Sequence, residues 1–244
     1  MTSLRLTLIA LLSFGTAGAA VAQGSDDWTA CTTGTDFDKT IAVCTTVISS
    51  GQETGPRLAK VYLARAIMEI WKGAIDKSFK APAIADLSQS IALDPTPTAL
   101  INRGEFYYED GRYADSAADF KQAADLDPED GPQVQLGMSY EHLGETKLAQ
   151  AAYDAMVAHN RADSDVYTAR GDFYRRSNKP LLAIADYKKA LRLEPKGYRT
   201  YANADLEYRL GLAERQKGDE KAAAKDIADA NAIYPGMQPP SESY

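Results

Sequence analysis

Histidine and cysteine are scarce in this chain of 244 residues, which contains two of each. His142 and His159 lie about a hundred residues from the cysteines, so a Cys/His metal site would have to be assembled across the fold. Two histidines also leave little for general acid–base catalysis. The chain contains no glycine-rich phosphate loop, no His-Glu-x-x-His and no Gly-x-Ser-x-Gly. The sequence therefore predicts a protein that is not an enzyme and that holds no cofactor or metal.

An excess of basic charge is also missing. The formal net charge is −7, and 25% of the residues are charged. Proteins that bind nucleic acid need a basic face to displace counterions, so a nucleic-acid partner is not expected. The 17 glycines and 11 prolines are too few for a collagen-like or disordered chain. These absences leave a folded protein whose partner is expected to be a protein or a peptide.

Long apolar runs are absent except near the N-terminus. The run from Leu6 to Ala20 follows Arg5, is interrupted by small polar residues and is followed by the small-x-small pattern Ala20-Val21-Ala22. This order predicts a signal peptide over residues 1–22. A membrane anchor is the alternative, but the run is shorter than the roughly 20 residues that a spanning helix needs. No cysteine stands at the cleavage point for lipid attachment. We expect an exported, soluble protein, located in the periplasm or, alternatively, secreted.

The two cysteines, Cys31 and Cys44, lie close together in the sequence. In an oxidising compartment such a pair is expected to form a disulfide. Closing a loop this short contributes roughly 3 kcal/mol in the chain-entropy picture. Two buried free thiols are the alternative.

A repeated segment is the strongest pattern in the chain. Residues 104–128 read GEFYYEDGRYADSAADFKQAADLDP, and residues 171–195 read GDFYRRSNKPLLAIADYKKALRLEP. Both begin with glycine, carry an aromatic pair at the third and fourth places and end on an acidic residue followed by proline. A repeat of this size cannot bury its apolar stripe alone, so it has to stack on further copies.

The same register continues along the chain. The leading glycine, called the anchor below, recurs with spacings of 33 to 40 residues, and an alanine, a large apolar residue and a proline recur at fixed distances after it. This pattern resembles the tetratricopeptide repeat over residues 57–236. The anchors are Gly104, Gly137, Gly171 and Gly211, with Ala66 in the first unit.

The resemblance implies an all-α fold, a right-handed superhelical solenoid of antiparallel helix pairs. About five units are expected, at residues 57–96, 97–129, 130–163, 164–197 and 198–236. Residues 23–55 are expected to form an N-terminal helical cap that carries the disulfide, and residues 237–244 a flexible tail. Left-handed residues are expected between the helices of a pair, at Gly111, Gly144, Asn178 and Gly218.

Some units depart from the common pattern. The first unit has about five extra residues around 71–79, and the fifth has about six extra around 196–203, near Tyr198. Either insertion could be a longer helix or a loop. In the third unit Arg161 stands where the closing proline is expected, so its boundary could shift.

The resemblance also implies which side chains line the concave face, because the first helix of each pair faces inward in this family. The predicted partner-binding residues are Ile67, Ile70, Trp71, Asn102, Glu105, Tyr108, Glu109, Glu141, His142, Asp172, Arg175, Arg176, Arg209 and Arg215, and the same positions include Gln135, Met138, Leu212 and Gln216.

In chain order these residues change from apolar to acidic to basic. A complementary partner would present an apolar anchor, then positive charge, then negative charge. The alternative is an ordinary solvated helix face. The function expected from the resemblance is a non-catalytic scaffold of the cell envelope that binds a protein or peptide in its concave groove. The alternative function is a structural or self-associating component of an envelope assembly, which would use the convex face or the array ends. The oligomeric state stays open.

Overall fold

The computed structural model describes residues 26–74, 76–129, 131–195 and 200–236, and these residues form helices and turns without any strand. The predicted all-α fold is confirmed. The chain divides into two compact units, at residues 1–95 and 96–244, which are considered separately below. The predicted signal peptide and the predicted tail lie outside the described residues.

The first compact unit begins with two helical segments that a disulfide joins. Residues 26–33 are helical and precede α2 (Phe37–Ser50), which packs on α3 (Gly55–Gly73). Asp36 caps α2 by accepting a hydrogen bond from the Lys39 backbone N–H at 3.0 Å. Cys31 and Cys44 are joined in a disulfide, and both are buried among apolar side chains. The predicted pairing of the two cysteines is therefore confirmed.

The insertion in the first repeat lengthens a helix and adds a short turn. The helix α3 has 19 residues and includes Trp71, while the 3₁₀ helix η1 (Lys77–Phe79) precedes α4 (Lys80–Leu93). Trp71 is 60% exposed on this unit. In the fifth repeat α11 already begins at Tyr201, whereas residues 196–199 lie outside the described residues.

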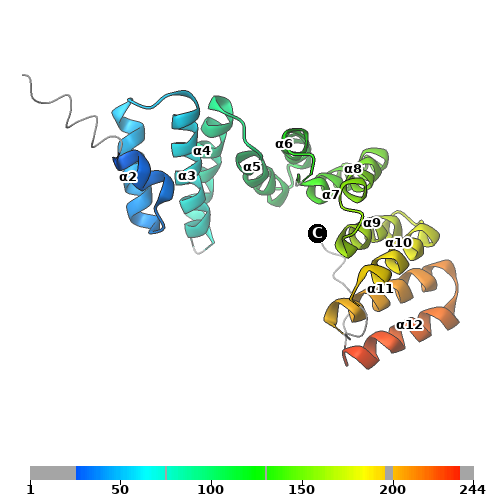
Figure 1. Ribbon diagram of the computed structural model, residues 1–244. Coiled ribbons are helices and arrows are strands. Elements are labelled where there is room, and N and C mark those ends of the chain that lie inside the picture. The colour runs from blue at the N-terminus through cyan, green and yellow to red at the C-terminus, as the bar shows by residue number, and fades with distance from the viewer. Residues whose placement is uncertain (1–25, 75, 130, 196–199, 237–244) are drawn as a thin grey trace, which may run out of the picture. The chain divides into compact units, whose positions relative to one another are not determined.

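The second compact unit is an array of antiparallel helix pairs. Each first helix packs on its own second helix, and each second helix packs on the first helix of the next pair, so α7, α9 and α11 follow one another on one side of the array (Figure 1). The pairs are α5 (Pro97–Glu109) with α6 (Tyr113–Leu126), α7 (Gln133–His142) with α8 (Thr146–His159), α9 (Ser164–Arg176) with α10 (Pro180–Leu193), and α11 (Tyr201–Lys217) with α12 (Glu220–Ile233).

Local sequence determines where these helices end. The four residues between the helices of a pair adopt left-handed backbone conformations, with φ of 71° at Gly111, 73° at Gly144, 57° at Asn178 and 94° at Gly218. The helices α6 and α10 end just before an acidic residue and proline, as the sequence predicts. Without that proline, α8 still ends at His159.

The anchor glycines allow close contact between the two helices of a pair. A Cβ atom built on Gly104 would lie 2.8 Å from the Phe120 ring, and one on Gly171 would lie 2.7 Å from the Tyr187 ring. Gly137 and Gly211 are as tightly enclosed. The recurring glycine is therefore required by packing and not by backbone conformation, since its φ is not positive.

Replacing an anchor glycine should consequently destabilise the fold. Alanine is favoured over glycine in a helix by about 1 kcal/mol, but the clash with Phe120 should outweigh this, so we expect Gly104→Ala to lower the free energy of unfolding by about 1–2 kcal/mol. Urea denaturation would measure the change.

The chain offers both a rescue and a control for this variant. The first repeat carries Ala66 and Leu87, both fully buried, where the second has Gly104 and Phe120, so Gly104→Ala combined with Phe120→Leu should cost less than the two single changes added together. Gly73→Ala is the control, because its Cβ would lie 3.8 Å from the nearest atom. Simple additivity of the two changes would contradict the packing argument.

Glu69 on α3 should make stability depend on pH. Its side chain is buried, and one carboxylate oxygen has no hydrogen-bond partner. Burial, with a smaller contribution from Asp86, raises the pKa of Glu69 from 4.5 to about 7. The folded state therefore holds the proton more tightly than the unfolded state, and the protein should lose stability as the pH rises from about 4.5 to 7.

Glu69→Gln should remove this dependence, because an amide has no charge to desolvate. At pH 8 the full shift corresponds to about 3 kcal/mol, and we expect a gain of about 2 kcal/mol because the buried amide still lacks some partners. Near pH 4 the variant should match the parent. Denaturation midpoints at both pH values, with the exposed Glu129→Gln as control, would measure this; an equal gain at both would contradict it.

Candidate binding surface

Side chains link successive first helices of the second compact unit, on the surface that the sequence predicts to be concave. Between α5 and α7, the Tyr108 hydroxyl and His142 Nε2 share a hydrogen bond of 2.9 Å. The His142 ring also stacks on Tyr113 of α6, with ring centroids 4.1 Å apart and planes 6° from parallel. Burial raises the pKa of Tyr108 to about 12, so its hydroxyl stays protonated at physiological pH. His142 is thus part of a structural aromatic cluster that is exposed on one side.

The next link, between α7 and α9, is an ion pair. The Arg176 guanidinium donates two hydrogen bonds, of 2.9 and 2.8 Å, to the carboxylate of Glu141. Tyr153 of α8 donates a further bond of 2.8 Å to the same carboxylate. Both partners of the ion pair are about four-fifths buried. A bidentate pair of this kind holds two helices in a defined register.

The third link joins α9 to α11 in a similar way. Asp172 accepts a hydrogen bond from the Tyr187 hydroxyl at 2.7 Å and also pairs with the guanidinium of Arg209. Asp205, one turn before Arg209 on α11, accepts a second bond from that guanidinium at 2.6 Å. The Arg209 side chain is therefore fixed at both ends of its guanidinium.

These links revise the charge pattern that the sequence indicates. Arg176 and Arg209 were expected to form the basic part of the groove, but each is paired with a carboxylate of a neighbouring first helix. Within each of these links the acidic and basic charges compensate one another, so Arg176 and Arg209 do not form a basic surface. The order of charges along the sequence does not reveal this, because the partners lie 35 and 37 residues apart.

The other predicted groove residues occupy different surroundings. Asn102 on α5 donates to the backbone carbonyl of Thr98, and Gln216 on α11 donates to the carbonyl of Arg175 on α9. Arg215 is half exposed, 3.5 Å from Glu220. Ile67, Ile70 and Trp71 belong to α3 of the first compact unit, where Ile67 lines a separate hollow of about 240 Å³ beside Cys31.

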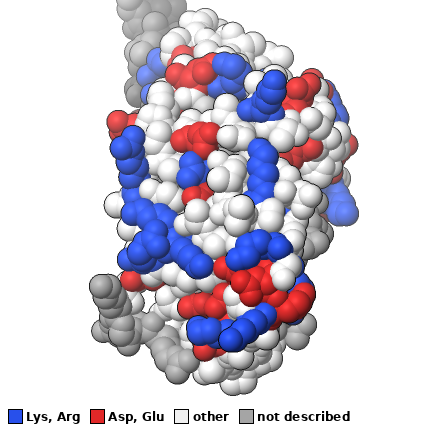
Figure 2. All heavy atoms as spheres, turned by 90° about the vertical axis from the view of Figure 1, so that its right-hand side faces the viewer, with Lys and Arg blue, Asp and Glu red and all other residues white. Residues whose placement is uncertain are grey.

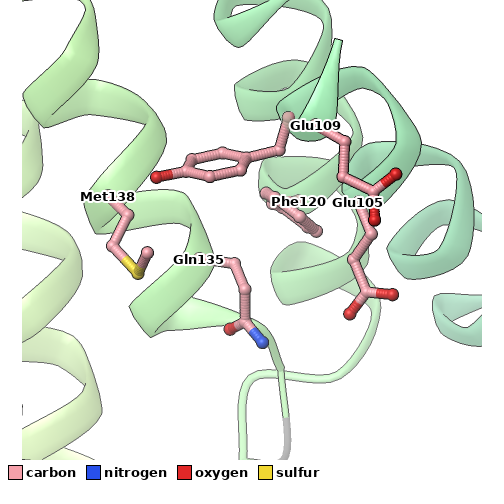
Figure 3. A pocket seen from close by; sticks show the side chains of 6 residues that line it. Glu105, Glu109, Phe120, Gln135 and Met138 are labelled. Atoms are coloured by element: carbon pink, nitrogen blue, oxygen red, sulfur yellow. The ribbon is translucent and has the colours of Figure 1, made fainter. Parts of the chain in front are cut away.

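A hollow of about 210 Å³ opens at the base of the α5–α7 surface. Figure 3 shows the Phe120 ring at its floor, with Glu105 and Glu109 of α5 on one side and Gln135 and Met138 of α7 on the other. Phe120 is 1% exposed. Tyr108 completes the lining. The structure thus brings together five of the residues that the sequence places on the concave face and adds Phe120, which the sequence assigns to the second helix.

The structure also contains buried ion pairs inside the repeats, which the sequence analysis did not predict. An arginine just before the anchor forms two hydrogen bonds with an aspartate of the second helix in three repeats. The two residues lie 16 apart in two of the pairs and 21 apart in the first repeat, which has about five extra residues, so the pattern could have been recognised in the sequence. The pairs are Arg65 with Asp86, Arg103 with Asp119, and Arg170 with Asp186.

The face of the molecule in Figure 2 carries basic and acidic side chains that are interspersed. Such mixing is typical of solvated surfaces. Some large apolar side chains on second helices are nevertheless exposed, among them Leu148 of α8 and Leu181 and Leu182 of α10. In the described part of the chain, no helix is both long and apolar enough to cross a membrane, and no cluster of three or more potential metal ligands occurs.

Comparison with protein families gives two matches to tetratricopeptide-repeat models, at residues 97–130 and 164–196. No curated protein sequence matches the chain significantly. Among solved structures, MamA from Desulfovibrio magneticus RS-1 superposes with a TM-score of 0.59 and 21% identity, covering 72% of this chain and 94% of MamA. YrrB, described as a tetratricopeptide-repeat protein with an unusual peptide-binding site, superposes with a TM-score of 0.60 and 20% identity, covering 80% and 93%. At these identities the structures support the fold.

Proposed function

We propose that this chain, two segments of which match tetratricopeptide-repeat models, is a non-catalytic scaffold of the cell envelope that binds a protein or peptide along its concave face. The observation that carries the proposal is the hollow beside Glu105 and Met138, which lies on the first helices where the links between repeats leave side chains accessible. Structurally similar YrrB has a described peptide-binding site.

The fixed links between the first helices support recognition by a preformed surface. Tyr108, Glu141 and Asp172 each tie one first helix to the next. The spacing of the first helices is therefore set before a partner binds, and such preorganisation favours affinity. The residues available to a partner are then those outside the links, including Glu105, Met138, Leu212 and Arg215.

Reversal of groove charge has to avoid the links. A glutamate at 176 would face Glu141 and disturb the helix packing, so the loss of binding would not report on the groove. We therefore choose Leu212→Glu combined with Arg215→Glu on α11, where Arg215 is half exposed. The matched control is Leu181→Glu on the second helix α10, whose side chain is 68% exposed.

The expected result concerns proteins captured from a cell-envelope extract by the chain without residues 1–22. The double variant on α11 should retain at least about tenfold less of a specific partner, equivalent to a loss of about 1.4 kcal/mol, whereas Leu181→Glu should retain it. Quantitative mass spectrometry of the captured proteins measures both. Capture that survives the change on α11 and is lost with Leu181→Glu would instead place the partner on the second helices.

That opposite outcome corresponds to the second candidate function, a structural or self-associating component of an envelope assembly. The exposed leucines of α8 and α10 favour it, as does the exposed pair of Tyr201 and Tyr234 at the end of the array, whose rings meet edge to face with centroids 5.2 Å apart. Exposed apolar side chains of this size are common where proteins associate. Sedimentation of the Leu181→Glu variant would reveal an altered oligomeric state.

The location of the protein belongs to the same proposal. A disulfide joins Cys31 to Cys44, and such bonds persist in oxidising compartments. Together with the signal-peptide pattern of residues 1–22, this supports export, to the periplasm or beyond the cell.

A further inference from the structure

The hollow at Glu105 has an occupied counterpart elsewhere in the same array. In the fourth repeat, Asp172 stands one place after the anchor, as Glu105 does in the second. Asp172 accepts a hydrogen bond from Tyr187 of the second helix and pairs with Arg209, two places before the next anchor. A carboxylate at this position of the repeat is thus neutralised by a guanidinium from the following repeat.

In the second repeat both of these donors are replaced. Phe120 stands where Tyr187 stands and has no hydroxyl, and Gln135 stands where Arg209 stands and has no charge. Among the described residues, no donor forms a hydrogen bond or ion pair with the Glu105 carboxylate. The position that a guanidinium fills at Asp172 is the open hollow at Glu105.

We propose that this hollow binds an arginine side chain of the partner, with its guanidinium against Glu105 and its aliphatic stem on Phe120 and Met138. This inference rests on the proposed function and specifies the chemistry of one contact within it. The hollow suits such a side chain because Phe120 and Met138 offer it apolar surface and the acidic residues stand on the α5 side (Figure 3). Met138 can adapt to the stem, since methionine side chains adjust easily.

The electrostatics of the hollow support a cationic occupant. Burial, with a smaller contribution from Glu109, raises the pKa of Glu105 above its usual range. The residue is exposed, so its carboxylate is only partly desolvated, and an incoming cation would favour the charged form. A planar guanidinium can form two parallel hydrogen bonds with a carboxylate, which an ammonium group cannot, so arginine should be preferred to lysine.

The test uses small probes and one reporter in the full chain without residues 1–22. N-acetylarginine amide is titrated against protein with ¹³C-methyl-labelled methionine, and the Met138 signal is followed by NMR. The citrulline analogue, which has the same shape without the charge, and the lysine analogue are the comparison probes. We expect the Met138 signal to shift on addition of the arginine probe. The citrulline analogue should bind at least about tenfold more weakly, and the lysine analogue should bind with intermediate affinity.

Two variants separate the proposal from unspecific effects. Glu105→Gln should weaken the binding of the arginine probe at least about tenfold. Gln135→Arg should abolish its binding because it rebuilds the arrangement of Arg209 and fills the hollow from within. Glu129→Gln, which is exposed and lies outside this hollow, is the control and should leave binding unchanged. Thermal melts would establish that the variants are folded.

The possible outcomes distinguish the hollow from the wider groove. Equal binding of arginine and citrulline, or undiminished binding to Glu105→Gln, would overturn the assignment of an arginine site. In that case, capture of the envelope partner by Gln135→Arg but not by the α11 double variant would support binding in the groove and contradict the arginine contact. Loss of capture in Gln135→Arg together with selective arginine binding supports both.

Discussion

Arg170→Leu should destabilise the protein by about 4 kcal/mol, the largest effect that we expect from a single change. Arg170 donates two hydrogen bonds of 2.8 Å to Asp186, whose side chain is 8% exposed, and a third to Asp154. Removing the guanidinium would leave the Asp186 carboxylate buried without its cation. The cost comes from that stranded charge and exceeds what the pair itself contributes to stability.

The reverse change should be milder. Asp186→Ala leaves Arg170 with Asp154, which is 44% exposed, so we expect a loss of about 2 kcal/mol. Replacing both residues together should leave the protein stable enough to fold, because no unpaired charge is then buried. The third repeat has Leu136 and Ala152 at the two equivalent positions, and both are buried.

The combined variant Arg170→Leu with Asp186→Ala copies that natural apolar pair and should cost about 1–2 kcal/mol, less than Arg170→Leu alone. Equilibrium denaturation of all three proteins completes a double-mutant cycle. Arg192→Leu, an exposed change on the same repeat, is the control. A combined variant as unstable as Arg170→Leu would show that the pair is needed as such.

Removing the disulfide should have the second largest effect. Cys31 and Cys44 close a loop with a sequence separation of 13, and their replacement by alanine should lower stability by about 3 kcal/mol. The loss should be confined to the first compact unit, where the helical residues 26–33 are held against α2. Hydrogen exchange should therefore accelerate in α2 and remain unchanged in α9 and α10.

A matched control and a direct assay accompany this prediction. Thr33 and Thr46 are exposed and lie two residues after the two cysteines, so their joint replacement by alanine should have little effect. The parent protein purified from an oxidising compartment should show no reactive thiol, with or without denaturant. Two thiols that react after denaturation would mean that the bond does not form there.

Helix boundaries and packing positions could be predicted because they depend on local chemistry. Gly111, Gly144, Asn178 and Gly218 mark left-handed turns by residue type alone, and the anchor glycines mark close packing by recurrence. The disulfide followed from having only two cysteines. Each of these features is determined by one residue or by one short segment.

The state of the groove could not be predicted, because it depends on pairs of distant residues. Arg176 and Glu141 were both placed on the concave face, but their pairing requires the stacking distance between two repeats. The same holds for Arg209 and Asp172. The hollow depends on the packing of two repeats, and it stays open because Gln135 stands where another repeat has an arginine. Whether the predicted groove residues bind a partner stays a prediction.

The links between first helices also have a mechanical consequence. Tyr108–His142, Glu141–Arg176 and Asp172–Arg209 each join one first helix to the next, so a change in the spacing of the first helices would stretch all three. Two of the three are ionic, and their side chains are at least four-fifths buried, so salt screens them much less than exposed pairs. The spacing of the first helices in the second compact unit should therefore depend little on ionic strength.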